Sequence, residues 1–275
     1  MALSIHTNFA SLVTQNTLSK NNNALSTAMQ RLGTGLRVNS AADDAAGLQI
    51  ANRLTAQTRG MAVAQRNAQD AIGLLQTADG ALDEISQIAF RMKDLALQAA
   101  NGTNSDDDKA ALNAEYQQLV AEINRITTDT TYGTDKLFTD GFIANGMTFQ
   151  IGASADETLA IEADVLALDD ITGADALSGD LTNDASAEIT NVDALIKAVG
   201  ATRAVLGANI NRLDHTINNL ASVSQNTEAA KGRIMDADFA AESSVMTKQQ
   251  MLMQSGISVL GNSNQLTGLV ASLLR

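Results

Sequence analysis

The sequence predicts a mainly α protein: an elongated helical bundle or coiled-coil rod, with paired N- and C-terminal helices and a small β-hairpin region. The 275 residues contain no proline, a residue that breaks helix interiors. Aromatic residues make up only 3% and tryptophan is absent, which favours thin bundles over a thick globular core. Long apolar heptads run through most of the chain, as they do in coiled coils.

Both ends of the chain carry apolar residues at a spacing of seven, and neither end can bury them alone. Most helical stability comes from packing an apolar face, so each end requires helical partners. We expect the two ends to pair with each other and to form the interface of a polymer. These residues, the terminal stripes, are Leu18, Leu25 and Leu32 near the start, and Val245, Met246, Leu252, Met253, Val259, Leu260, Leu266, Leu273 and Leu274 near the end.

Residues 41–100 are expected to form one helix, with Ser40 and Asp43 as a capping box at its start. Its seam keeps heptad spacing over sixteen positions, of which fourteen are apolar. Such a helix would span roughly 90 Å, too long for a compact domain. The seam consists of Gly47, Ile50, Leu54, Gln57, Met61, Ala64, Ala68, Ala71, Leu75, Ala78, Leu82, Ile85, Ala89, Met92, Ala96 and Ala99.

A second helix is expected after a break at residues 101–104, folding back on the first as an antiparallel hairpin. Ser105 and Asp108 form its capping box. Its expected buried face consists of Leu112, Tyr116, Leu119, Ile123 and Ile126.

The pattern changes after Thr130. Apolar residues alternate on both sides of 152–157, which predicts a β-hairpin within about 132–165. Residues 166–185 have little periodicity and are expected to form a short acidic surface excursion. A third long helix is expected over about 187–231, with Arg203 alone interrupting its seam, then a joint near 231–233 and a last helix from about 238.

These elements predict two domains with different charge. Residues 1–43 and 235–275 would form a coiled-coil domain of terminal helices, and residues 44–234 a helical rod carrying the hairpin and the excursion. Residues 129–193 hold fourteen Asp or Glu and one Lys, so the rest of the chain is neutral overall. Neutral ends can associate without self-repulsion, while an acidic middle stays hydrated.

The sequence lacks the common catalytic and metal-binding motifs, so we expect no enzyme activity, no cofactor and no metal. His6 and His215 stand alone, and Asp106–Asp108 fit a first-turn helix cap better than a cation site. No basic stripe with aromatics points to nucleic acid, and no apolar run approaches the roughly 20 residues of a membrane span. The first residues do not resemble a general secretory signal, so secretion would require a dedicated export system.

Three blocks of the chain resemble the bacterial flagellins. Residues 30–47, QRLGTGLRVNSAADDAAG, are close to the flagellin pattern RLSSGLRINSAxDDAAG. Residues 94–101, DLALQAAN, match a second block, and residues 233–240 through to the closing 272–275 match a third. The likeness covers about 1–165 and 187–275 and fails only in the acidic excursion, where flagellins differ most. Gly33 stands where Ser is usual.

The resemblance implies a secreted structural subunit of the bacterial flagellum, in a short form without large outer domains. Flagellins pass unfolded through the flagellar type III export apparatus and polymerise into a hollow helical propeller for motility. The implied partners are further copies of the chain, a chaperone holding the C-terminal helix, the filament cap and the hook–filament junction proteins.

The resemblance also implies a recognition site. Arg91, Leu95 and Glu115 match the residues by which flagellins engage a host Toll-like receptor. Each has another interpretation, since Leu95 lies near the heptad seam and the two charges could form salt bridges between subunits.

Three other functions remain open at this point. A hook–filament junction protein shares the terminal design. An enzyme with a metallopeptidase insert is disfavoured by the short middle and the missing His-Glu-x-x-His. A coiled-coil adaptor would form a discrete oligomer, whereas a flagellin forms an open polymer.

Overall fold

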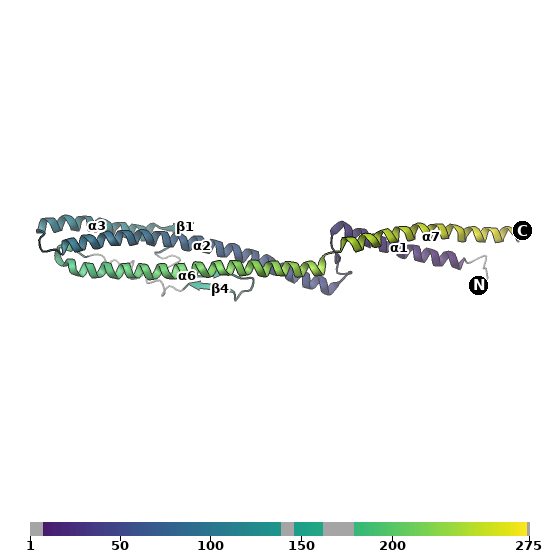
Figure 1. Cartoon of the computed structure of the whole chain (residues 1–275), viewed down its shortest axis with the longest axis horizontal. Coiled ribbons are helices and arrows are strands. Elements are labelled where there is room, and N and C mark those ends of the chain that lie inside the picture. The colour runs from purple at the N-terminus through teal and green to yellow at the C-terminus, as the bar shows by residue number, and fades with distance from the viewer. Residues whose placement is uncertain (1–7, 139–145, 162–178, 274–275) are drawn as a thin grey trace. The chain divides into compact units, whose positions relative to one another are not determined.

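The computed structural model describes residues 8–138, 146–161 and 179–273, with side chains described as far as residue 265. The chain divides into two compact units (Figure 1). The terminal unit contains the residues up to 56 and those from 226 onward, and the middle unit contains residues 57–225. Within the described ranges, we find no helix that combines the length and apolar character of a membrane span. The expected domain boundaries at 43/44 and 234/235 stay a prediction.

The terminal unit is built on α1, Phe9–Thr34, and α7, Phe239–Leu273, which lie side by side and antiparallel (Figure 1). The Asn8 side chain caps α1 by accepting from the Ser11 backbone N–H at 3.1 Å, and it donates to the Ser263 carbonyl on α7 at 3.0 Å. Helix α1 ends at Gly35, whose φ of 73° is the left-handed conformation that glycine adopts readily. The predicted pairing of the two ends is confirmed.

The chain leaves α1 and enters α7 through two adjacent backbone segments. Leu36 and Asp236 form an isolated antiparallel bridge, and the Ala237 N–H donates to the Gly35 carbonyl at 2.9 Å. Helix α6, Leu181–Met235, therefore continues past the joint expected at 231–233 and ends just before Asp236. The expectation was wrong because a glycine flanked by basic residues does not stop a helix whose backbone bonds continue.

Helix α2 spans Ala45–Ala99, and the first part of its predicted heptad seam is only partly buried, since Ile50 is 40% exposed. From Met61 onward, every predicted seam position is buried, with 0 to 2% of its surface exposed. The expected start was wrong. Asp43 accepts from the Ser40 backbone and hydroxyl and closes a separate turn, and the helix begins after Asp44, which accepts from the Gly47 N–H at 2.8 Å.

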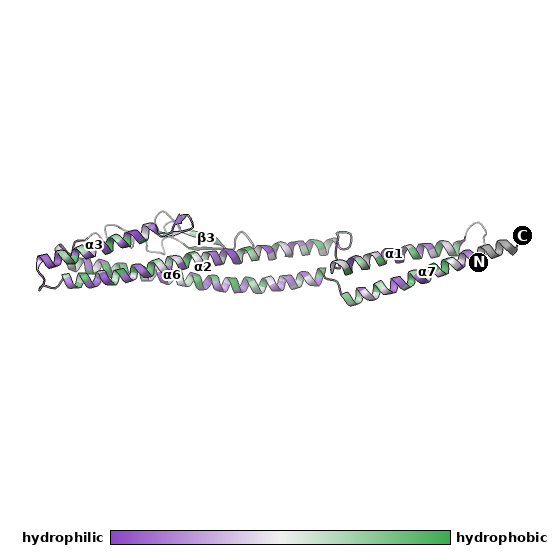
Figure 2. Cartoon of the chain, turned by 90° about the horizontal axis from the view of Figure 1, so that it is seen from above, coloured by the Kyte–Doolittle hydropathy of each residue, from purple (hydrophilic) through white to green (hydrophobic). Residues whose placement is uncertain are grey.

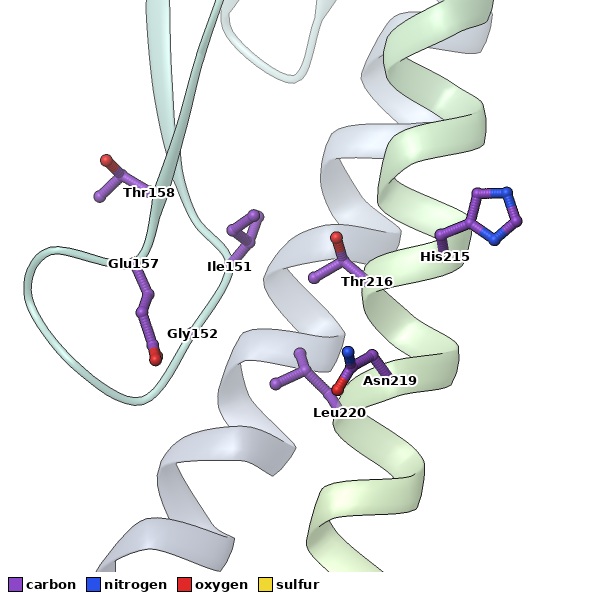
Figure 3. Close-up of a pocket in the computed structure, with 8 residues that line it drawn as sticks. All are labelled: Ile151, Gly152, Glu157, Thr158, His215, Thr216, Asn219 and Leu220. Atoms are coloured by element: carbon purple, nitrogen blue, oxygen red, sulfur yellow. The ribbon is translucent and has the colours of Figure 1, made fainter.

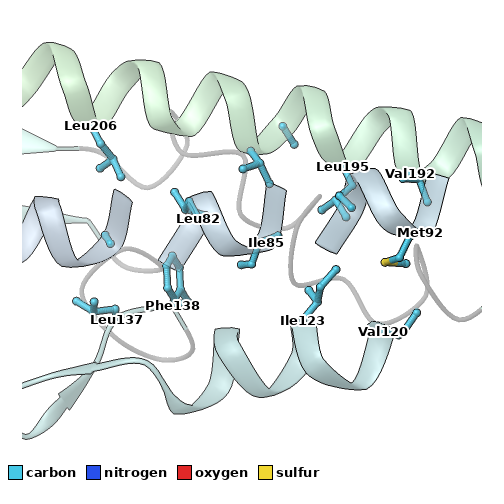
Figure 4. Close-up of a cluster of buried hydrophobic side chains, with 14 of the residues drawn as sticks. Leu82, Ile85, Met92, Val120, Ile123, Leu137, Phe138, Val192, Leu195 and Leu206 are labelled. Atoms are coloured by element: carbon cyan, nitrogen blue, oxygen red, sulfur yellow. The ribbon is translucent and has the colours of Figure 1, made fainter. Parts of the chain in front are cut away.

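Helix α3, Asp106–Asp129, begins at the predicted capping box, in which Ser105 and Asp108 bond each other reciprocally. Together with α2 and α6 it forms the core of the middle unit (Figure 4). Tyr116 and Ile123 are fully buried, and the other three predicted face residues are partly buried against the same core.

Two antiparallel hairpins complete the middle unit. Strands β3, Met147–Gln150, and β4, Thr158–Ile161, pair with Phe149 opposite Leu159, as the alternation predicted. Strands β1, Thr131–Tyr132, and β2, Asp135–Lys136, were not expected. They turn at Gly133, whose φ is 68°, and bring Leu137 and Phe138 into the core.

The expected acidic excursion lies largely outside the described residues, which resume at Gly179. Its last part, from Leu181, is helical rather than irregular, and only Asp184 has a non-helical backbone there. Leu181 is buried, which gives this first turn a packing role that the weak periodicity did not reveal.

Candidate assembly and recognition surfaces

The terminal stripes separate into an inner and an outer face. On α7, Met246, Met253 and Leu260 are half-buried against α1, whereas Val245, Leu252 and Val259 are 40%, 41% and 55% exposed. Neighbouring residues of a helix point about 100° apart, so one partner helix cannot cover both rows.

On α1 the stripe faces inward throughout. Leu25 is buried, and Leu18 and Leu32 are half-buried. The side chains of Leu266 and Leu273, and all of Leu274, lie outside the described residues.

The seam between α1 and α7 combines these apolar residues with small ones such as Gly256, while further large apolar residues lie outside it. A side chain on Gly256 would place its Cβ 3.3 Å from Leu18, so the helices approach closely there. Figure 2 shows hydrophobic bands recurring along both helices. The exposed large apolar side chains are Phe9, Leu12, Val13, Met29, Phe239, Val245, Met251, Leu252, Ile257 and Val259, which we call the outer face.

The expected recognition residues are only partly brought together on the surface. Arg91 on α2 and Glu115 on α3 form an ion pair at 2.6 Å, with side chains 55% and 47% exposed. Leu95 is 1% exposed and packs in the core. This burial agrees with the other interpretation of Leu95, a position near the heptad seam, and its part in recognition stays a prediction.

The sequence contained a signal for the burial of Leu95. Leu74, Ala81, Ile88 and Leu95 form a second heptad row on α2, and all four are buried or partly buried in the core. A helix with partners on two sides needs two such rows. The large apolar residues exposed on this part of α2 are instead Phe90 and Leu97.

An open cavity of about 460 Å³ lies between the turn joining β3 and β4 and one face of α6 (Figure 3). Ile151, Glu157 and Leu220 are among its lining residues, and the Glu157 carboxylate accepts from the Ser154 N–H. His215 projects from α6 away from the hairpin turn, and His6 lies outside the described residues (Figure 3). His215 and Glu157 both line this cavity, but His215 projects away from the turn that carries Glu157 (Figure 3).

The Asp108 carboxylate at the start of α3 fits a structural role. The Ser105 hydroxyl and N–H hold the pKa of the Asp108 carboxyl below its usual range, which keeps this helix cap ionised. Among the described residues, no three His, Asp or Glu side chains are placed to hold a metal ion.

Two family profiles match most of the chain. The bacterial flagellin N-terminal helical region matches residues 5–142, and the bacterial flagellin C-terminal helical region matches residues 189–274. The chain belongs to the bacterial flagellin family. Flagellin is a structural protein of the extracellular flagellar filament, and this chain is accordingly a filament subunit that functions outside the cell.

Individual relatives agree with this assignment. A flagellin of Halalkalibacterium halodurans is 44% identical over 251 residues, which cover 90% of this chain and 91% of the relative. Flagellin A of Vibrio anguillarum is 35% identical in an alignment of 381 positions that covers both chains completely. Because this flagellin has 275 residues, the alignment includes positions that it lacks, as expected of a short form.

A likeness in fold also extends to another flagellar protein. A structure described as a flagellar hook-associated protein from Vibrio parahaemolyticus has a TM-score of 0.53 and 17% identity, covering 70% of this chain and all of that one. At this identity the likeness concerns the fold alone.

Proposed function

We propose that this flagellin polymerises through the outer face of α1 and α7. The observation that carries the proposal is the contrast on α7: Val245, Leu252 and Val259 recur every seven residues and stay exposed although α1 is already paired. Patches of large exposed apolar side chains mark interaction sites. A row of apolar residues at heptad spacing fits the apolar face of another helix. The helices that match this apolar row are the paired terminal helices of neighbouring copies of the chain.

Leu252→Asp tests this interface. A carboxylate at an interface that excludes water costs several kcal/mol, and the cost recurs with each added subunit. Leu252 is exposed in the single chain, so monomer helicity should change little. We expect seeded polymerisation, followed by sedimentation and electron microscopy, to show no filament.

Two further variants separate the faces. Asn262→Asp adds the same charge to an exposed position of α7 and should polymerise more nearly like the parent. Leu260→Asp places the charge against α1 and should disturb the helix pair of the monomer as well. Normal filament yield from Leu252→Asp would refute the proposed interface.

The same outer face supports a second use before assembly. A chain exported unfolded through the type III apparatus would expose the α7 stripe, and an apolar stripe on one helix is what a helix-in-groove chaperone covers. The cap and hook–filament junction proteins would meet the ends of the polymer. We expect a bound chaperone to cover Leu252 and block polymerisation. Release of the chaperone should then restore filament growth.

Recognition of the monomer by a Toll-like receptor is proposed through Arg91 and Glu115. Both side chains are exposed, and their ion pair joins α2 to α3. The two charges therefore lie together on one surface. Replacing both with Ala should abolish signalling in a receptor reporter assay while circular dichroism stays unchanged. Arg125→Ala with Glu122→Ala removes a comparable exposed pair on α3 and is the control. Full signalling by the first variant would refute this site.

Leu95 has a different proposed part in recognition. Because it is buried, Leu95→Ala would act through the packing of α2, at a cost of about 2–5 kcal/mol, rather than through a lost contact. We propose no catalytic activity for this flagellin. Between a filament subunit and a hook–filament junction protein, the matched family profiles favour the filament subunit.

A further inference from the structure

We propose that the contact between Tyr116 on α3 and Glu188 on α6 sets the register in which α6 packs in the middle unit. The inference concerns how the chain selects one fold, and it does not depend on the proposed polymer interface.

The apolar seam between α2 and α6 does not by itself specify one register. Ion pairs join Lys93 to Asp193 at 2.6 Å and Arg203 to Asp83 at 2.7 Å, so the helices run antiparallel and Met92 lies across from Val192 (Figure 4). The buried residues of both helices repeat every seven positions. A slip of seven residues, about 10 Å along the helix, would again place apolar side chains opposite each other.

A second buried row of α6 differs from the first because it is mostly polar. It consists of Glu188, Leu195, Thr202 and Asn209, which are 5%, 2%, 0% and 8% exposed. Asn209 donates to the Val205 carbonyl and accepts from Arg212, both in α6 itself, and these bonds move with the helix. Glu188 accepts from the Asn191 amide of α6 at 3.0 Å, and its other oxygen accepts from the Tyr116 hydroxyl of α3 at 2.8 Å, a bond that crosses between helices.

Tyr116 belongs to a face of α3 that holds the beginning of α6. Asn113 accepts from the Leu181 N–H at 3.1 Å, and Gln117 donates to the Gly179 carbonyl at 2.8 Å. Gly179 lies so close to Glu188 that an added Cβ would come 1.6 Å from the carboxylate oxygen. The Glu188 carboxylate is thus enclosed by α3 and the segment entering α6.

A heptad slip in either direction would break this contact. It would bring Leu181 or Leu195 to the Tyr116 hydroxyl, and one direction would move the Glu188 carboxylate into the layer now filled by Leu195. A buried hydroxyl or carboxylate without its partner is strongly unfavourable. A single polar residue in an apolar seam is a well-attested way to specify register.

Arg203 is a weaker candidate for setting the register of α6. It pairs with Asp79 at 2.8 Å and Asp83 at 2.7 Å, but its side chain is 33% exposed and those of its partners are 39% and 49% exposed. Exposed pairs of this kind contribute little. The buried contact at Glu188 therefore dominates the choice.

Disulfide trapping can test the proposal directly, because the chain contains no cysteine. Ala71→Cys with Leu213→Cys reports the observed register, and Ala71→Cys with Leu206→Cys or Leu220→Cys reports the two slips. In the otherwise unchanged monomer, only the first pair should oxidise. In Tyr116→Phe with Glu188→Leu, the slip disulfides should rise at least roughly tenfold while the helical signal remains.

A matched control and a milder variant complete the test. Asn209→Leu makes the same kind of polar-to-apolar change in the same row, but its bonds lie within α6, so the slip disulfides should stay at the parent level. Tyr116→Phe alone removes only the oxygen and should give a smaller rise. Unchanged disulfide patterns in both Tyr116 variants, with cooperative melting, would overturn the proposal, as would an equal rise in Asn209→Leu.

Discussion

The terminal helix pair and the middle bundle share one heptad pattern and use it in opposite ways. In the middle, the seam of α2 is 0 to 2% exposed from Met61 onward. In the terminal pair, the inner row of α7 is only half-buried, and its outer row is 40 to 55% exposed. A heptad stripe therefore shows that a helix needs a partner, but not whether that partner belongs to the same chain.

The number of partner helices and the polar atoms in each seam explain this difference in burial. The middle seam buries Leu82 and Ile85 in a core to which both α3 and α6 contribute. The terminal seam has one partner, and two buried side-chain atoms there, Arg31 Nε and Gln249 Oε1, lack a hydrogen-bond partner among the described residues. A seam with unsatisfied polar atoms gains less from closing.

The largest expected effect is a charge inside the middle seam. Leu82 is fully buried, so Leu82→Asp would leave an unpaired carboxylate in the core at a cost of about 3–5 kcal/mol or more. We expect the monomer to lose its cooperative thermal transition by circular dichroism. Leu97→Asp, at a site 51% exposed on the same helix, should melt close to the parent. Similar melts for both variants would erase the distinction between seam and surface.

A second prediction compares the two regions in one experiment. Because the terminal pair is less well buried, brief protease treatment of the dilute monomer should remove both ends first and leave a core of about residues 57–225. Mass spectrometry of the fragments measures the order of cleavage. Ends that survive as long as the core would mean that the terminal pair is as stable as the middle bundle.

Much of this arrangement could be predicted from the sequence, because spacing reports which residues share a face. The long helices, the capping box at Ser105 and the β3–β4 hairpin followed from periodicity and local hydrogen bonding. The start of α2 did not, because Asp43 and Asp44 are equally good caps by sequence and only the turn at Ser40 decides between them. Local patterns locate helix ends poorly.

The candidate sites were predictable to a smaller extent, because burial depends on how many helices surround a residue. Leu95 and the exposed Leu97 are both leucines on one helix, and they differ only in which side α3 and α6 cover. The buried carboxylate of Glu188 was missed for a related reason. Its partner Tyr116 is distant in sequence, and no local pattern pairs them.

A third prediction concerns alkaline pH and the middle bundle. Burial and the neighbouring Glu188 carboxylate raise the pKa of the Tyr116 hydroxyl well above its usual range. The folded state therefore keeps the proton that the unfolded chain releases above about pH 10, so stability is full below that pH and falls as the pH rises. Chemical unfolding at increasing pH should show this fall.

Tyr116→Phe provides the comparison for the alkaline effect. It should be less stable than the parent near neutral pH but lose less stability as the pH rises, because the buried ionisable group is gone. Since the chain has two tyrosines and no tryptophan, absorbance can follow their ionisation against this variant. Parallel pH profiles for parent and variant would show that Tyr116 does not control the alkaline limit.

The smallest expected effect distinguishes the two regions at acid pH. Hydrogen bonds from Ser105 lower the pKa of Asp108 in the middle bundle, and bonds from Ser40 lower that of Asp43 in the terminal unit. A lowered folded pKa gives stability that is present above the ordinary value near 4 and is lost as the pH falls through the lowered value. Asp108→Asn removes the titration, so unfolding of the middle bundle should depend less steeply on pH below the ordinary value near 4. Asp43→Asn makes the same change at a turn outside that bundle and should leave the pH dependence of the main transition unaltered. If Asp43→Asn changed this transition as much as Asp108→Asn, the two units would unfold as one, and the contrast between them would fail.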